Sequence, residues 1–74
     1  MAMHLAKNIH TLRVIYGYTQ KKVAADLKIT QSFYSKIERD QASVPADLLM
    51  KIAEYFHITV KKLLYSDLAN NINT

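Results

Sequence analysis

The side chains best suited to chemistry in this chain are hydrogen-bonding groups that gather within residues 31–38. If this segment is a helix with Tyr34 and Ile37 turned inward, its outer face carries no carboxylate, whereas an ordinary solvated face usually mixes both signs. Glutamine can pair with adenine through two hydrogen bonds, lysine can reach guanine or a phosphate, and serine accepts several partners. This face is therefore predicted to read base edges, the alternative being a merely solvated surface. Its members are Gln31, Ser32, Ser35 and Lys36.

Catalytic and metal-binding groups lack the pattern that their chemistry requires. There is no cysteine, and the three histidines (His4, His10 and His57) do not share a helical face at i, i+4 spacing. We therefore expect no metal site. Paired carboxylates, a Ser-His-Asp set and a phosphate-binding loop are also missing from the sequence. The chain is expected not to be an enzyme and to need no cofactor.

Composition indicates a small helical protein, and its positive charge favours a polyanionic partner. Its 74 residues suffice for a single domain, predicted to span 1–74. Ten Lys and Arg against six Asp and Glu give a net charge of +4. No apolar run is long enough to span a bilayer and no secretory signal precedes the domain, so we expect a cytoplasmic protein without membrane contact. One glycine and one proline favour helices joined by short turns.

The candidate base-reading segment is the second of two short helices joined by a sharp turn. Thr19 is suited to cap a helix over 20–27, and Thr30 to cap the helix over 31–38. Ala24 lies midway along the first helix, where a small side chain lets two backbones cross closely. This pattern predicts a helix-turn-helix over about 20–38, although an ordinary corner between two helices would have similar spacing.

The remaining segments predict three more helices and complete an all-α, compact five-helix bundle. The first is expected over about 3–16 and ends at Gly17. Ser43 is the expected cap of the fourth helix, and Thr59 that of a fifth helix reaching about Leu68. The tail, 70–74, is expected to fray.

Two charged residues, Arg13 and Glu38, stand in stretches that otherwise read as core-facing. A partly buried pair between the first and third helices would fix how these helices are oriented. The alternative is that they are two unrelated surface charges, which is where most such residues lie.

The chain resembles the Cro/C1-type helix-turn-helix family, also called the XRE family, over about residues 5–65. The resemblance rests on several separated matches in register. These are Arg13, the Thr19-Gln20 opening with Ala24, the run Ser35-Lys36-Ile37-Glu38-Arg39, and the run Leu48-Leu49-Met50-Lys51-Ile52-Ala53. The resemblance implies a lambda-repressor-like DNA-binding domain in a transcriptional regulator of repressor or controller type. It also implies a homodimer on a palindromic double-stranded operator.

By this resemblance, Gln20 would contact a phosphate and brace Gln31, which would read a base. Arg13 and Glu38 would form the family's structural ion pair. The amide groups that begin the 20–27 helix also suit a phosphate, and neighbouring lysines add positive charge there. The expected phosphate contacts are Gln20, Lys21, Lys22, Thr30, Arg39 and Gln41.

Three positions depart from the family pattern. Lys28 and Asp40 stand where glycine is common, which implies strained or different turns. Asp40 also places a negative charge near the expected path of the phosphates. Tyr34 stands where a branched aliphatic residue is usual, so its hydroxyl needs a partner.

Apolar residues in the 55–68 region exceed what a small core needs, and they are the candidates for joining two copies. The alternative for each is that it completes the monomer core. A second function also stays open, that of an antitoxin-type module that binds a protein partner and uses DNA binding for autoregulation. The candidate interface residues are Tyr55, Ile58, Leu64, Tyr65 and Leu68.

Overall fold

The computed structural model describes residues 3–71, and within that range the chain forms six α-helices and no strand. The all-α class agrees with the sequence prediction, but the expected count of five helices is wrong. Of the predicted frayed tail, Asn70 and Asn71 belong to the last helix, and residues 72–74 lie outside the described range. The helices are α1 (Leu5–Tyr16), α2 (Gln20–Leu27), α3 (Gln31–Glu38), α4 (Ala46–Tyr55), α5 (Val60–Tyr65) and α6 (Leu68–Asn71).

Three threonines begin three of these helices, as the sequence predicts. The hydroxyl of Thr19 accepts a hydrogen bond from the Lys22 amide at 3.0 Å. Thr30 and Thr59 cap α3 and α5 in the same way, each at 3.1 Å. At the end of α1, Gly17 takes the left-handed conformation with φ 73°, where glycine has no steric cost. Local signals therefore set most helix ends.

The predicted cap of the fourth helix is wrong. Ser43 lies in an irregular segment, and α4 begins only after Pro45, which stands at the N-cap position with φ −60° and ψ 154°. Proline suits this position because the missing N–H would have no partner in the helix.

The predicted fifth helix is interrupted between Tyr65 and Leu68, and Asn8 of α1 explains the interruption. This side chain is fully buried. Its amide nitrogen donates to the carbonyls of Leu63 at 2.8 Å and Ser66 at 2.6 Å, while its oxygen accepts from the Leu68 amide at 3.2 Å. Backbone groups left free where the helix stops are thus satisfied by one distant side chain. The chain turns at the break and α6 packs against α1.

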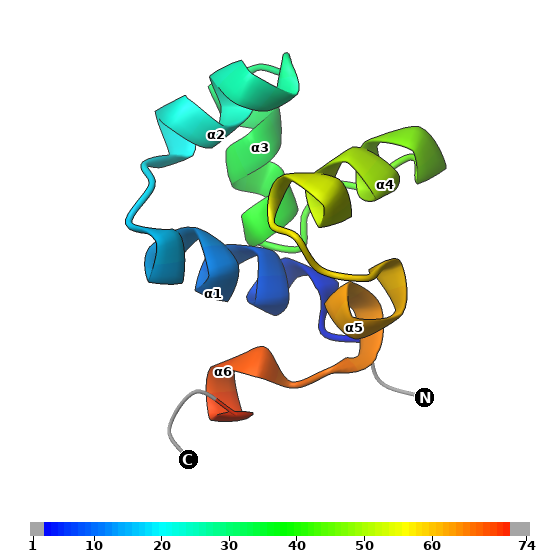
Figure 1. The fold of residues 1–74 in the computed structure, drawn as a ribbon. Helices are drawn as coiled ribbons and strands as arrows, with labels where there is room; N and C mark the ends of the chain where they lie inside the picture. The colour runs from blue at the N-terminus through cyan, green and yellow to red at the C-terminus, as the bar shows by residue number, and fades with distance from the viewer. Residues whose placement is uncertain (1–2, 72–74) are drawn as a thin grey trace.

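Helix α1 lies in the middle of the molecule, between the α2–α3 pair on one side and α6 on the other (Figure 1). It also contacts α5, while α4 packs against α2 and α5. None of the helices in the described range is long and apolar enough to cross a membrane. The buried apolar core consists of Ile9, Leu12, Val23, Ala24, Leu27, Tyr34, Ile37, Leu48, Ile52, Ala53, Phe56 and Leu63.

Candidate nucleic-acid interface

The two short helices α2 and α3 are joined by a turn that places α3 across α2. Lys28 ends α2 in the left-handed conformation with φ 61° and ψ 40°. The amide of Ile29 then donates to the carbonyl of Ala24 at 3.0 Å, closing the end of the helix. Ala24 is only 2% exposed and lies in the core that the two helices share. The small side chain permits the close approach that the sequence suggests.

The outer face of α3 is polar and carries no acidic side chain. Tyr34 and Ile37 are buried, so the opposite side of this short helix faces solvent. Gln31, Ser32 and Lys36 are exposed, and Ser35 is half-buried. The four predicted base-reading residues therefore share one helix, with three of them freely accessible.

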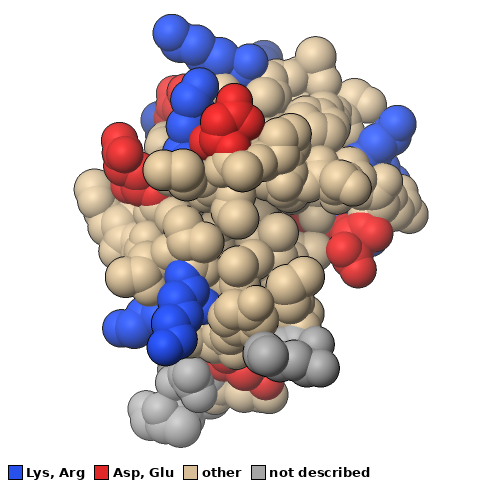
Figure 2. All heavy atoms as spheres, turned by 90° about the vertical axis from the view of Figure 1, so that its right-hand side faces the viewer, with Lys and Arg blue, Asp and Glu red and all other residues tan. Residues whose placement is uncertain are grey.

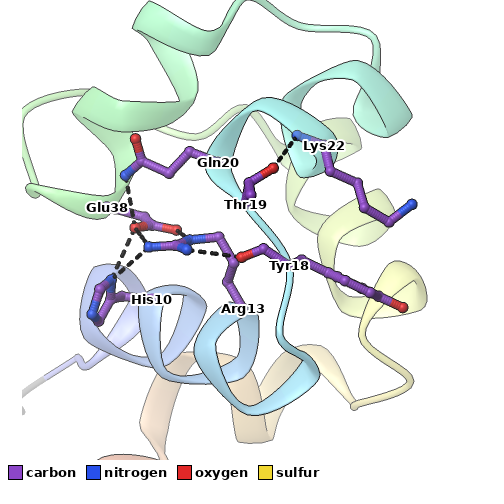
Figure 3. Close-up of polar contacts among 7 residues, drawn as sticks. All are labelled: His10, Arg13, Tyr18, Thr19, Gln20, Lys22 and Glu38. Carbon is purple, nitrogen blue, oxygen red and sulfur yellow. Dashed lines mark hydrogen bonds and ion pairs between the residues drawn. The ribbon is translucent and has the colours of Figure 1, made fainter.

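A hydrogen-bonded network around the Glu38 carboxylate links α3 to α1 and to the start of α2 (Figure 3). Arg13 forms a bidentate ion pair with Glu38, with Arg13 Nε 2.7 Å from Oε2 and Nη2 3.1 Å from Oε1. The Gln20 amide nitrogen donates to Oε1 at 3.0 Å, and His10 Nδ1 lies 3.0 Å from the same oxygen. Only 3% of the Glu38 side chain and 15% of the Arg13 side chain are exposed. The two residues form a shielded ion pair.

This network keeps Glu38 charged and fixes its neighbours. Burial alone would raise the pKa of the Glu38 carboxyl, but hydrogen bonds from Arg13 and its other neighbours lower it to about 2. Tyr34 is buried beside the pair, and burial raises the pKa of its phenol well above the usual range. Its hydroxyl makes no hydrogen bond of good geometry among the described residues, so the partner expected from the sequence is not found.

The network also decides which way Gln20 faces. A carboxylate only accepts hydrogen bonds, so Gln20 must turn its amide nitrogen toward Glu38. Its carbonyl oxygen points away from the network (Figure 3). Since phosphate oxygens are acceptors as well, this oxygen cannot bind a phosphate, and only the second N–H of the amide is left as a side-chain donor. The sequence does not predict this hydrogen bond of Gln20, because its partner Glu38 lies on another helix.

The other candidate phosphate contacts lie at helix ends and in the loop after α3. Lys21 and Lys22 are both exposed in the first turn of α2, and Thr30 is exposed at the start of α3. Arg39 and Gln41 are exposed beyond the end of α3. Asp40 between them adopts φ 58°, so both non-glycine residues singled out in the sequence, Lys28 and Asp40, occupy left-handed backbone positions.

One lysine in this group is already paired. Lys22 Nζ lies 3.2 Å from Asp26 Oδ2 and 5.1 Å from the centre of the Tyr18 ring. Asp26 also accepts a hydrogen bond of 2.6 Å from the Tyr55 hydroxyl. The spacing of Lys22 and Asp26 by four residues is the feature of the sequence that indicates this pair.

The candidate dimer residues do not form one exposed patch. Tyr55, Ile58 and Leu68 are half-buried and pack against the core. Leu64 is half-buried and lines a groove of about 950 Å³ between the start of α1, the segment after α3, α4 and α5. Tyr65 is the exposed member, at 44%.

Comparison with known proteins decides the family. The helix-turn-helix family profile matches residues 9–63, which is most of the chain. This chain belongs to the helix-turn-helix family. The sequence prediction of a Cro/C1-type member is thereby confirmed. The segment predicted to form the motif, about 20–38, corresponds to α2 and α3.

Relatives and solved structures agree with this assignment. The HTH-type transcriptional regulator ImmR of Bacillus subtilis (strain 168) is 34% identical over 65 residues, which cover 88% of this chain and 51% of ImmR. The chain thus spans about half the length of this curated relative. A transcriptional regulator from Listeria innocua has the same fold, with a TM-score of 0.82 at 18% identity over 97% of this chain and 73% of that one. The hypothetical transcription factor NHTF from Neisseria gives 0.79 at 21% identity, over 95% of this chain and 80% of its own.

Proposed function

We propose that this helix-turn-helix domain binds double-stranded DNA sequence-specifically and regulates transcription, with α3 in the major groove. The observation that carries the proposal is the outer face of α3, where Gln31, Ser32 and Lys36 are exposed and no carboxylate competes with DNA. These side chains suit base edges, and one helix of this size fits the groove. Family membership and the names of ImmR and the two solved structures support the same function.

In this proposal, different residues position the protein and read the sequence. Lys21, Thr30, Arg39 and Gln41 are all exposed, and we expect them to contact the sugar–phosphate backbone. Contacts of this kind set register without reading bases. Gln31 reads a base, while Ser32, Ser35 and Lys36 line the groove. The Arg13–Glu38 pair holds α3 against α1 and so fixes the reading helix relative to the rest of the domain.

A pair of variants tests reading against positioning. Duplexes that bind are first selected from a random pool, and affinity is then titrated on the selected duplex and on a scrambled one. Gln31→Ala should cost about 1–3 kcal/mol on the selected duplex and much less on the scrambled one. Lys21→Ala should weaken binding to both alike and lower the salt slope by about one unit per subunit. Equal losses for Gln31→Ala on both duplexes would refute α3 as the reading helix.

We also propose that two copies bind a palindromic operator as a homodimer. One short helix reads only a few base pairs, so useful specificity needs two half-sites about one DNA turn apart. The groove offers the apolar residues Leu5, Val44, Leu49 and Leu64 for this contact. Charged residues, among them Lys7, Arg39 and Asp40, line the same groove. Figure 2 views the side of the molecule where α4, α5 and the start of α1 lie, and it shows mostly uncharged atoms at the centre of that side.

Sedimentation tests the assembly. Tyr65→Lys should weaken dimerisation, because it places a charge beside the groove residue Leu64. Val14→Lys is the matched control, since Val14 is 56% exposed but lies toward the other end of α1 from the groove. A parent protein that stays monomeric at high concentration would contradict the homodimer.

Occupancy of an operator excludes other proteins from that DNA, so we propose repression in the cytoplasm as the mode of regulation.

A further inference from the structure

Adjacent lysines at the start of α2 have different surroundings. Lys21 is exposed, and no carboxylate among residues 3–71 lies within ion-pair distance of it. Lys22, one residue later, has its ammonium group 3.2 Å from Asp26 and above the Tyr18 ring. In Figure 3 the Lys22 and Tyr18 side chains extend on the opposite side of α2 from Gln20 and Glu38. The two lysines are therefore not equivalent as ligands for phosphate.

Asp26 is not a free surface carboxylate, because α4 holds it. The Tyr55 hydroxyl donates to Asp26 Oδ2 at 2.6 Å, a length typical of a hydrogen bond to a charged oxygen. The ring of Tyr55 in turn packs against Tyr18, with ring centroids 6.0 Å apart, and against Phe56 at 5.0 Å. The hydrogen bonds from Tyr55 and Lys22 hold the pKa of Asp26 below its usual value. The carboxylate thus stays charged and fixed beside Lys22 at neutral pH.

We propose that Asp26, anchored by Tyr55, competes with the DNA backbone for Lys22, so that the first turn of α2 offers a phosphate only one free lysine, Lys21. This inference rests on the proposed DNA-binding function and refines it. A phosphate that approached Lys22 would have to displace the carboxylate or accept its negative charge close by. Asp26 therefore lowers the affinity of the domain for every duplex, whatever the base sequence.

Asp26→Asn tests the inference directly, because asparagine keeps an acceptor for the Tyr55 hydroxyl and removes the charge. Binding is measured by fluorescence anisotropy over a series of salt concentrations, on the selected duplex and on a scrambled one. The variant should bind both duplexes about two- to fivefold more tightly at low salt, the amount an exposed ion pair can withhold. The slope of log affinity against log salt should steepen by about 0.9 per subunit, since one more phosphate is neutralised.

Two controls separate release of Lys22 from a general change in charge. Glu54→Gln removes the same charge from a residue that lines the same shallow groove as Asp26, but Glu54 has no ion pair with Lys22. Its salt slope should stay that of the parent. In a Lys22→Ala background, Asp26→Asn should no longer raise affinity, so the double-mutant cycle isolates the pair.

Each other result overturns one of the two proposals. An unchanged slope for Asp26→Asn, an equal gain for Glu54→Gln, or a gain that persists without Lys22 would refute the competition while leaving DNA binding intact. Weaker binding by Asp26→Asn would show that Asp26 positions Lys22 for phosphate instead. A parent protein that binds no duplex would refute the proposed function, and the competition with it.

Discussion

Helix α1 carries two polar centres that tie it to opposite parts of the molecule by different means. Toward its C-terminal end, Arg13 meets Glu38 in a charged network that joins side chains of α1, α2 and α3. One turn and a half earlier, Asn8 binds backbone groups at the break between α5 and α6 with a neutral amide. The charged centre fixes how helices and side chains are oriented at the candidate interface, whereas the neutral centre fixes the path of the backbone.

This difference indicates which of the two polar centres can be replaced with less loss of stability. An ion pair can be replaced on both sides by apolar side chains without leaving an unpaired charge in the protein. The partners of Asn8 are two main-chain carbonyls, which no substitution can remove, and the Leu68 amide, which only proline would remove. We therefore expect the neutral centre to matter more for stability, and the charged centre to give stability its dependence on pH and salt.

The largest expected effect is that of Asn8→Leu. Leucine has a similar size but leaves the Leu63 carbonyl without its partner in the core and frees the Ser66 and Leu68 groups, so unfolding free energy should fall by about 4 kcal/mol. Urea denaturation measures the loss, and hydrogen exchange should show α6 opening first. Thr11→Val is the control, since Thr11 is also buried on α1 but takes no part in the hydrogen bonds at the break between α5 and α6. A comparable loss for Thr11→Val would remove the distinction.

Next in size is Arg13→Ala, with an expected loss of about 3 kcal/mol, because it leaves the shielded Glu38 carboxylate without its main partner. The double variant Arg13→Met with Glu38→Leu should lose much less, about 1 kcal/mol. Chemical denaturation of the single and double variants gives the coupling. Equal and small losses in both would mean that the pair contributes nothing.

Acidic pH should weaken the stabilisation by the charged centre but not that by the neutral centre. The pKa of Glu38 is about 2 in the folded protein and 4.5 in its ordinary state, so its stabilisation is present above about pH 5 and is lost as pH falls toward 2. Between about pH 7 and pH 3 this residue should account for a loss of about 2 kcal/mol. Glu38→Gln should flatten that part of the profile, whereas an Asn8 variant should keep the slope of the parent. Thermal unfolding at a series of pH values distinguishes the two outcomes.

Salt should produce the smallest difference. Raising sodium chloride from about 0.1 M to about 1 M shortens the screening length, so the cost of Arg13→Ala should shrink by roughly 0.5 kcal/mol because the pair is only partly shielded. The cost of Asn8→Leu should not change, since no charge is involved. Denaturation in urea, which adds no ions, allows the comparison. A salt-dependent cost for Asn8→Leu would contradict the assignment of the centre as neutral.

How much of this arrangement the sequence predicts depends on how local each cause is. Thr19 and Thr30 act within their own helix turns, and the bounds of α2 and α3 follow from them. The apolar spacing that buries Tyr34 and Ile37 also determines which side chains α3 presents outward. These features need no knowledge of the rest of the fold, and they account for the predicted interface.

The features that escaped prediction come from contacts between distant segments. The break after Tyr65 is caused by Asn8, whose partners are 55 to 60 residues away along the chain. A signal existed, since Asn8 lies three residues after Leu5 and four before Leu12 and so interrupts the apolar stripe of α1 with a polar side chain. The hydrogen bond from Gln20 to Glu38 has no such signal, because nothing in the local sequence indicates which acceptor the Gln20 amide binds.

The Asn8 centre also has a consequence for the order in which the protein folds as it is synthesised. Helix α1 precedes α5 and α6 in the chain and so leaves the ribosome before them, yet the buried Asn8 amide has no partner until residue 63 has followed and is not fully paired until residue 68. The α2–α3 pair, whose contacts are close in sequence, can form much earlier. During translation the Asn8 side chain of α1 therefore stays without its partners, and docking of α6 on α1 is the step that completes the burial of Asn8.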